Sequence, residues 1–399
     1  NWTMKFFNSL LISLSILFFY FFAFRLTGNR KKTLFSTFVL TMIPSYLSHF
    51  IWAHTLIPML FILVIYAYLM ADYDKKWNLV ALVGIASIFV VQPSQPIKIS
   101  LLLLIYLFVD SIIKYKFLWE KYAAFIFGFV LSLSWWLVAI LRHGSKFMGG
   151  FITTEASSGE ATKASVNVII KIINSVFSLL NPYAGTATRK YTFSDFFIAK
   201  NTNMINNPIG LGLVISIVLI FSIFVLFIKY KKILEEQNKW LIVTSFWFIA
   251  TFLLVNSDTF DLPIGLGAFR VWMLMAIPVS LLCGEGYSYL ENKTEKYSIL
   301  KIIVLLILVG GIYYTSGVQK YAVNTAMWPN DIGWRSQDEI SAYAWLKDNI
   351  ETNANVFDFS ARDKGVIGLD KNICFWCEDV INFRKDFFSH SGDELYSFL

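Results

Sequence analysis

The feature that most constrains this chain is a run without Asp, Glu, Lys or Arg from Thr33 to Met70. As a single helix it would be about 57 Å long, almost twice the ~30 Å of hydrocarbon in a bilayer. Pro44, Ser45 and His49 lie near its middle and mark a break. We therefore expect two membrane-spanning helices here, joined by a turn.

Similar apolar runs recur along most of the chain. Hydrophobic residues make up 56% of it and charged residues 15%, against about 25% charge in soluble domains. The lengths of the runs fit helices rather than the alternating strands of a barrel. The sequence thus predicts an α-helical polytopic membrane protein with about ten spans, at 5–24, 34–50, 54–71, 77–93, 99–113, 122–141, 209–228, 240–256, 266–286 and 299–317.

Lysine and arginine gather in every second loop, and short basic loops stay in the cytoplasm. They follow the first, third, fifth, seventh and ninth spans: Arg25, Arg30, Lys31, Lys32, Lys75, Lys76, Lys114, Lys116, Lys121, Lys229, Lys231, Lys232, Lys293 and Lys296. This topology places Asn1, the long loop 142–208 and everything after Gly317 outside. It also explains the net charge of +7 without a nucleic-acid partner.

The two outer regions differ in pattern. In the loop, Val166–Leu180 is apolar but short for a span, so we expect an interfacial or re-entrant helix. After the spans, Ser336–Asn349 has helical spacing and Asn355–Phe359 is strand-like. We expect the start of an extracytoplasmic α/β domain.

We expect a transmembrane domain, 1–317, and a soluble domain, 318–399. We also expect that the sequence is a fragment of a longer chain, truncated at both ends. In the soluble part Cys374 and Cys377 form a C-x-x-C pair, for which a local disulfide is the simplest interpretation. No second such pair completes a zinc site, and Cys283 falls within a span.

Arg270 is the sharpest candidate for a binding residue, because it lies about one turn inside the ninth span. A charge at the centre of a span costs about 2.5–3.5 kcal/mol, and less near the interface, so a partner is expected. An anionic ligand such as a phosphate would serve as that partner. Alternatively, Arg270 extends to the head groups or pairs with Asp258 or Asp261.

The outer loop carries a second set of candidates. Thr153 and Glu155 open a polar stretch that can order over a substrate, and Arg189 and Lys190 can offer cations to a phosphate. A solvated surface loop that also contains Glu160 is the alternative.

His49 and His54 lie at the outer turn between the second and third spans. Two imidazoles there can line a site or hold a metal, although a pair alone is not a metal motif. A structural role is the alternative, with Trp52 as an interface anchor. The sequence has no phosphate-binding glycine loop or nucleophile elbow, so a soluble enzyme is not supported.

The order of four motifs resembles the polytopic GT-C glycosyltransferases, especially archaeal members near the catalytic subunit of oligosaccharyltransferase. The four segments are Ile43-Pro44-Ser45-Tyr46-Leu47-Ser48-His49, Thr153-Thr154-Glu155, Phe269-Arg270-Val271-Trp272-Met273-Leu274 with Pro278 and Gly284, and Ala344-Trp345-Leu346-Lys347-Asp348-Asn349. The resemblance implies a GT-C-like bundle in the membrane that takes a sugar or glycan from a polyprenyl phosphate or pyrophosphate carrier and delivers it to a protein or glycan acceptor.

By this resemblance Glu155 acts on the acceptor or metal side and Arg270 faces the lipid phosphate. His49, His54, Arg189 and Lys190 are further substrate-binding candidates. A divalent metal, Mg²⁺ or Mn²⁺, would sit at Glu155 or His49. The family's catalytic Asp is expected in a first outer loop that would precede Asn1.

This chain also departs from the family pattern. The acidic pair expected near His49 and His54 is absent, which puts metal dependence in question. The Trp-Trp-Asp-Tyr-Gly sequence of true oligosaccharyltransferases is absent too. Two other classes therefore stay open: a transporter or flippase, which favours repeated halves and several intramembrane charges, and a non-catalytic scaffold with an outer binding domain.

Overall fold

The structure is a computed structural model that describes residues 2–46, 56–91, 96–152, 191–199, 209–236, 238–257, 259–260, 268–325, 337–356, 371, 378–385 and 391–398. The chain divides into two compact units, Asn1–Ala326 and Met327–Leu399.

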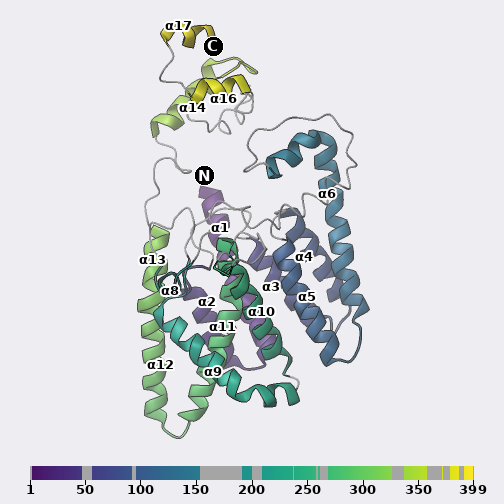
Figure 1. The fold of residues 1–399 in the computed structure, drawn as a ribbon, viewed down its shortest axis with the longest axis vertical. Coiled ribbons are helices and arrows are strands. Elements are labelled where there is room, and N and C mark those ends of the chain that lie inside the picture. Colours follow the sequence, from purple (N-terminus) through teal and green to yellow (C-terminus); the bar gives the residue numbers. More distant parts are fainter. Residues whose placement is uncertain are drawn as a thin grey trace. The chain divides into compact units, whose positions relative to one another are not determined.

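The first unit is a bundle of helices (Figure 1). In chain order they are α1 (Trp2–Thr27), α2 (Arg30–Met42), α3 (Leu56–Met70), α4 (Trp77–Val91), α5 (Pro96–Ile113), α6 (Trp119–Ile152), α8 (Phe193–Phe197), α9 (Leu213–Glu235), α10 (Lys239–Val255), α11 (Ala268–Lys293), α12 (Ser298–Ile312), the π-helical turn η3 (Tyr313–Gly317) and α13 (Val318–Thr325).

Within the described residues, five helices are long and apolar enough to cross a membrane: α1, α6, α9, α11 and the continuous helix Ser298–Thr325. The apolar helices α3, α4 and α10 are shorter. Helices suit hydrocarbon because each backbone polar group is satisfied within its own segment. The prediction of an α-helical polytopic membrane protein is confirmed.

Several predicted span ends are displaced. The second span was expected to reach residue 50, but α2 ends at Met42 because Ile43, which precedes Pro44, is extended (φ −61°, ψ 122°). The break predicted around Pro44 is therefore present, but it starts earlier. The sixth span was expected to end at 141, whereas α6 continues through Ile152 into the predicted loop.

The last span was expected to end at 317, where Gln319 and Lys320 make the sequence polar. The helix instead continues through the π-helical turn to Thr325. This places Lys320 on a helix of the bundle rather than in a linker.

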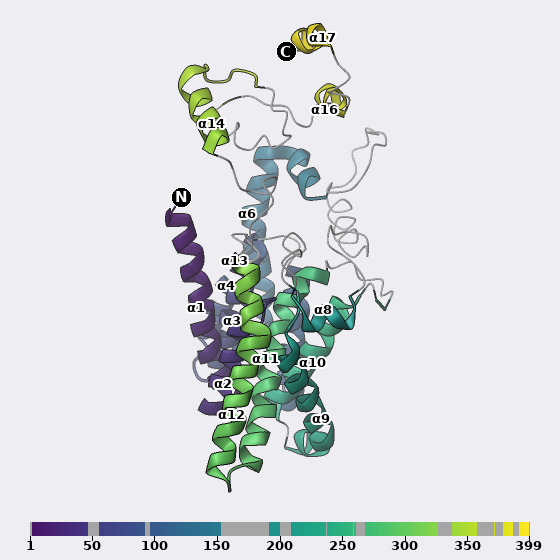
Figure 2. The same ribbon diagram turned by 90° about the vertical axis from the view of Figure 1, so that its left-hand side faces the viewer.

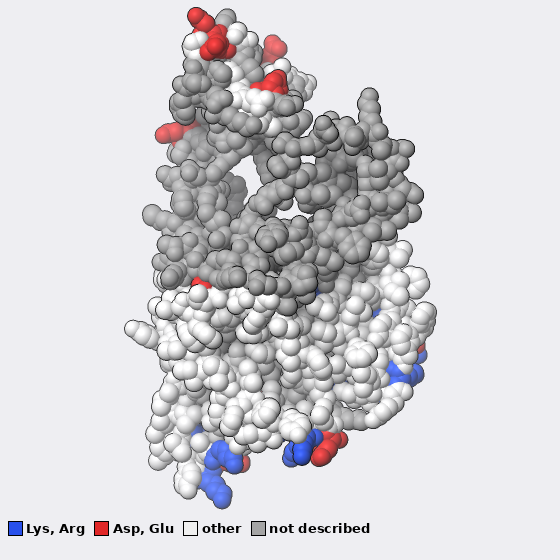
Figure 3. Space-filling model, in the orientation of Figure 1, with Lys and Arg blue, Asp and Glu red and all other residues white. Residues whose placement is uncertain are grey.

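The bundle of helices has two ends, which differ in the charge of their connections. At the first end lie the connections α1–α2, α3–α4, α5–α6, α9–α10 and α11–α12, and we call it the basic end because Lys and Arg gather there (Figure 3). Contacts such as Arg25 over the Tyr73 ring and Lys31 with Glu291 join these connections. The other end carries the start of α11 and the end of α13 (Figure 2), and we call it the opposite end.

Local sequence explains the sharp α1–α2 connection at the basic end. Gly28 adopts a positive φ of 65° and donates to the Phe24 carbonyl, which closes α1. The Asn29 side chain then accepts a hydrogen bond from the Lys32 N–H at 3.0 Å and caps α2. The chain reverses within two residues.

The core of the bundle centres on α11, whose described residues are almost all buried from Val271 to Tyr287. Two of its glycines permit close approach of other helices. A Cβ on Gly284 would lie 3.0 Å from the Lys32 carbonyl of α2, and one on Gly286 would lie 2.2 Å from Ser222 Oγ of α9. Small residues at such contacts are typical of packing between membrane helices.

The second unit contains α14 (Gln337–Asn349), α16 (Glu378–Lys385) and α17 (Gly392–Phe398). The first of these matches the helix predicted at Ser336–Asn349. Most of the predicted strand Asn355–Phe359, and both Cys374 and Cys377, lie outside the described residues, as does the interfacial helix predicted in the loop.

Candidate functional site at the opposite end

Most of the predicted site residues lie outside the described part of the chain: Glu155, His49, His54, Arg189 and Lys190, together with Asp258 and Asp261. Arg270 is the third residue of α11 and so lies in the first turn of that helix, at the opposite end.

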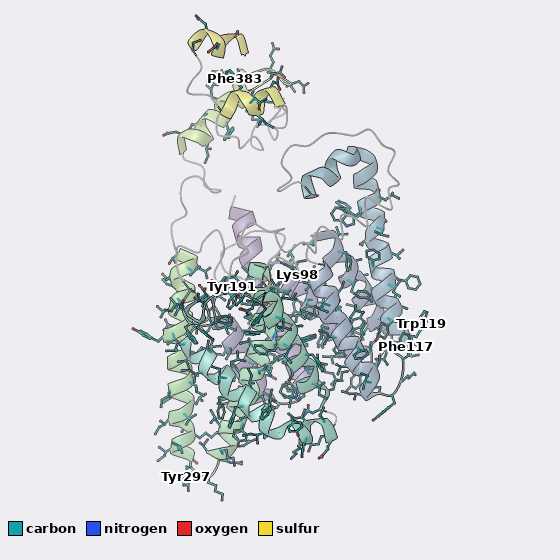
Figure 4. All side chains as sticks on the ribbon, viewed as in Figure 1. Lys98, Phe117, Trp119, Tyr191, Tyr297 and Phe383 are labelled. Atoms are coloured by element: carbon teal, nitrogen blue, oxygen red, sulfur yellow. The ribbon has the colours of Figure 1, made fainter. Side chains whose placement is uncertain are left out.

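Two aromatic contacts place the segment after Arg189 and Lys190 against α11. The ring of Tyr191 contacts that of Trp272 edge-on, with centroids 5.5 Å apart and planes at 90°. Phe196 also contacts Trp272, at 4.7 Å. Because Trp272 is two residues after Arg270, the chain that leaves Lys190 is held next to the helical turn of Arg270. Figure 4 labels Tyr191 at this end of the bundle.

Residues Tyr191–Ala199, which we call the α8 platform, have a local reason to turn. Asp195 accepts hydrogen bonds from the Thr192 N–H at 2.8 Å and from the Thr192 hydroxyl at 3.1 Å, which fixes the start of the short helix. Asp195 is itself buried. These hydrogen bonds fix the backbone at the start of the α8 platform, although its helix has only five residues.

A glycine-containing segment, Ile209–Gly212, is hydrogen-bonded to the α8 platform. The N–H groups of Leu211 and Gly212 both donate to the Phe196 carbonyl, at 2.8 and 3.1 Å. Gly210 and Gly212 have φ of 102° and 91°, and a Cβ on Gly212 would lie 2.0 Å from Ser316 Oγ. Residues with a side chain rarely adopt this backbone, so glycine is required here.

The π-helical turn η3 supplies caps to its neighbours. The Ser316 hydroxyl donates to the Leu211 carbonyl at 2.8 Å, and the Thr315 hydroxyl accepts from the Val214 N–H at 3.2 Å. The first N–H groups of α9 lack partners within that helix, so Thr315 caps it from another element. An extra residue in a helical turn, such as η3 has, is frequent at functional sites.

Gln319 and Lys320, on α13, connect the α8 platform with other segments at the opposite end. Gln319 accepts from the Ala199 N–H at 2.6 Å and donates to the Phe197 carbonyl at 3.2 Å. Lys320 donates to the carbonyls of Thr41 and Tyr46, at 2.9 and 2.7 Å, and lies 5.7 Å from the Tyr46 ring centroid. Tyr46 is three residues before His49, so α13 also fixes the turn that leads to the predicted histidines.

Sequence reasoning missed Lys320 and Lys98. Lys98 is 2% exposed on the first turn of α5 (Figure 4). Both were assigned to connections because a lysine ended the apolar run. The available signal for Lys320 was the apolar pair Tyr321-Ala322 after it, which continues the helical pattern.

No group of three or more His, Cys, Asp or Glu side chains suited to a metal occurs in the described part of the chain. The candidates for Mg²⁺ or Mn²⁺, Glu155 and His49, are not in that part. A metal site therefore stays a prediction.

A second polar cluster lies at the basic end. Asp110, fully buried, contacts the amines of Lys114, Lys121 and Lys239 at 3.1, 2.8 and 2.6 Å. Asp72 also contacts Lys114 and Lys121, at 2.6 and 2.8 Å. Burial alone would lower the pKa of Lys114, but its hydrogen bond to Asp72 and the nearby charges raise the pKa above 10.5. We call these five residues the Asp110 cluster.

Comparison with known proteins gives distant likenesses among solved structures alone. No protein-family model and no curated protein matches this chain. Among solved structures, it is similar to an oligosaccharyltransferase of Archaeoglobus fulgidus, tethered by a disulfide bond to an acceptor peptide with the NVT sequon. The two are 11% identical with a TM-score of 0.47, and the match covers 87% of this chain and 46% of that one. The chain thus spans less than half the length of that enzyme.

Proposed function

We propose that this chain is part of a membrane glycosyltransferase of GT-C type. It would move a sugar or glycan from a polyprenyl-phosphate-type lipid carrier to a protein or glycan acceptor. The reaction would take place on the extracytoplasmic face, which is the opposite end of the bundle if the basic end is cytoplasmic.

The observation that carries the proposal is the place of Arg270. It lies in the first turn of α11, away from the basic end, and its neighbour Trp272 packs on the α8 platform. The platform follows Lys190 directly, and α13 holds the turn before His49. Arg270 therefore lies at the opposite end of the bundle. The described residues closest in sequence to Lys190 and His49, which are Tyr191 and Tyr46, lie at the same end.

The chemistry of the reaction fits such an arrangement. When a sugar leaves a lipid phosphate, negative charge grows on the phosphate, and a fixed cation stabilises it. Arg270 would supply that charge. Glu155 would hold or activate the acceptor, and the loop 142–208 would cover the site and exclude water.

A divalent metal would add charge stabilisation at the phosphate or acceptor. Glu155 and His49 are the residues that would hold it, with oxygen and nitrogen donors acceptable to Mn²⁺. The roles of Arg270 and of the covering loop do not depend on it.

The test is transfer of radiolabelled sugar from host polyprenyl lipids to a panel of acceptors by purified full-length protein. Arg270→Ala should lower the transfer rate by about 10²–10³-fold, the usual loss when one preorganised donor to a developing anion is removed. Glu155→Gln should also lower it strongly. Arg25→Ala is the matched control, because Arg25 lies at the basic end over Tyr73, and it should leave transfer unchanged.

Two results would contradict the proposal. One is full activity of folded Arg270→Ala protein. The other is no transfer by the wild-type protein with any carrier and acceptor. If the wild-type protein then moves a labelled prenyl-phosphate lipid between leaflets of a vesicle, the chain is a flippase.

A further inference from the structure

Lys320 is an unusual cation for its position. It lies in the helix Ser298–Thr325, which is long and apolar enough to cross a membrane. Charges in such helices are costly and rare, and they mark ligand or ion sites when they are not paired. Intramembrane charges at the basic end are paired with their opposites, as Lys32 is with Glu285 and Glu291 with Lys301.

The contacts of Lys320 differ in kind from those pairs. Its amine donates to two backbone carbonyls, of Thr41 and Tyr46, and no carboxylate contacts it within the described residues. Carbonyl dipoles orient an ammonium group but leave its net charge in place. An ammonium has three N–H donors, so one remains for a further acceptor. A low-dielectric site with an uncompensated cation favours an anion.

The position of Lys320 relative to Arg270 follows from a chain of contacts. Gln319, the residue before Lys320, is hydrogen-bonded to both Phe197 and Ala199 of the α8 platform. Phe196 of the same platform packs on Trp272, two residues after Arg270. Arg270 and Lys320 therefore lie on two helices that both contact the α8 platform.

We propose that Lys320 binds the phosphate group of the polyprenyl carrier, as a second cation beside the one from α11. This inference rests on the proposed function. Lys320 as a whole residue is partly exposed, and its amine lies between the carbonyls of Thr41 and Tyr46. The carbonyls of Thr41 and Tyr46 hold the amine in place before the ligand arrives, and this lowers the conformational entropy lost on binding.

The same contacts also join α13 to the end of α2, so the test must separate charge from packing. Lys320→Gln keeps an amide with two N–H donors but removes the charge. Lys320→Arg keeps both the donors and the charge. Lys116→Gln makes the same change of net charge in the α5–α6 turn of the basic end, and is the matched control.

The experiment measures binding to purified full-length protein in nanodiscs of phosphatidylcholine. The probes are a short-chain polyprenyl monophosphate, the matching prenol without phosphate, and phosphatidylglycerol as a lipid with a phosphate diester. Lys320→Gln should weaken binding of the prenyl phosphate by about tenfold to a hundredfold, the usual effect of losing one hydrogen bond to a charged group. Lys320→Arg should bind like wild type, as should Lys116→Gln, and prenol binding should not change.

Equal prenyl-phosphate affinity of wild type and Lys320→Gln would overturn the inference. Lys320-dependent binding of phosphatidylglycerol with none of the prenyl phosphate would also overturn it, because the phosphate would then belong to a head group. Sugar transfer without Lys320-dependent binding removes this inference and keeps the proposed function. Lys320-dependent binding of the prenyl phosphate without any sugar transfer keeps the phosphate-binding role of Lys320 and removes the proposed transferase function.

A measurement on the wild-type protein covers the case in which Lys320→Gln does not fold. Reductive methylation of lysines, followed by peptide mass spectrometry, reports the reactivity of each amine. The prenyl phosphate should protect Lys320 and leave Lys116 as reactive as before. Absence of protection at a saturating concentration would overturn the inference.

Discussion

The two ends of the bundle treat buried charge in different ways. At the basic end, acids and lysines neutralise one another: Asp110 contacts three lysines, and Lys32 pairs with Glu285 where both side chains are about one-tenth exposed. At the opposite end, the amine of Lys320 is held by the carbonyls of Thr41 and Tyr46. Both patterns fix helices to one another, but the second does so through backbone carbonyls, with no carboxylate at the amine within the described residues.

This difference separates stability from ligand binding. A buried charge that loses its partner destabilises the fold, because its desolvation is no longer offset. A cation held by carbonyls gains its counter-charge only when an anion arrives. We therefore expect substitutions at the basic end to change mainly the free energy of unfolding, and charge removal at Lys320 to change mainly ligand affinity.

The largest effect on stability is expected in the Asp110 cluster. Asp110→Asn leaves the three ammonium groups of the cluster with Asp72 as their one remaining carboxylate in the cluster, and should lower the free energy of unfolding by about 3–5 kcal/mol. Unfolding in detergent mixtures with increasing SDS measures this change. Adding Lys239→Met should restore part of the loss, because one of the repelling charges is removed. A loss below about 1 kcal/mol would show that the Asp110 cluster contributes little to holding the helices together.

A pair of glycines compares the ends at the level of the backbone. Gly28 and Gly212 both have positive φ, but a Cβ on Gly28 meets nothing within 4 Å, whereas one on Gly212 would meet Ser316 Oγ and the Thr315 carbonyl. Gly28→Ala should therefore cost only the backbone strain, about 1–2 kcal/mol. Gly212→Ala should cost about 1–3 kcal/mol more, because it also overpacks the contact.

The same unfolding assay measures both glycine variants. Equal losses would mean that the close approach of Gly212 to η3 adds nothing to the strain of its backbone. In that case η3 would not be held against the start of α9 as closely as its hydrogen bonds indicate.

The pair Lys32–Glu285 offers a smaller and more specific test. It joins α2 to α11, and Lys32 also lies 4.5 Å from the centroid of the Trp240 ring. In a double-mutant cycle, Lys32→Gln and Glu285→Gln should show a coupling energy of about 0.5–3 kcal/mol, so that the double variant is more stable than the sum predicts. Strict additivity in the unfolding assay would contradict a direct interaction.

The smallest effect is expected where a basic-end pair is exposed. Lys75 and Glu120 form a salt bridge with side chains 78% and 52% exposed. Glu120→Gln should change the free energy of unfolding by about 0–1 kcal/mol, and the change should shrink further in high salt. A salt-independent loss as large as that of Asp110→Asn would break the comparison between buried and exposed pairs.

Of the site residues predicted from the sequence, the structure describes the backbone position of Arg270, and the roles of all of them stay predictions. Arg270 is visible as a lone charge in an apolar run, and its place in a helical turn agrees with that interpretation. Lys320 was missed because Gln319 and Lys320 together imitate the end of a span. The contacts that reveal it come from residues at least 120 positions away, at Ala199 and Tyr46.

The sequence by itself determined the kind of protein and the class of its elements. Apolar runs near the thickness of a bilayer can satisfy their backbone only as helices, so their helical class and rough position follow from composition along the chain. Pro44 and the residues Gly28 and Asn29 also fixed local breaks, because their effects on φ and on capping act within a few residues.

Tertiary structure alone decided which charges meet. Asp110 became the centre of a cluster because lysines from α6 and α10 reach it across the bundle. The α8 platform came next to Arg270 through Trp272, and Lys320 came to the end of α2 through packing of α13. Such contacts depend on how helices distant in sequence pack, and neither hydropathy nor charge spacing encodes that geometry.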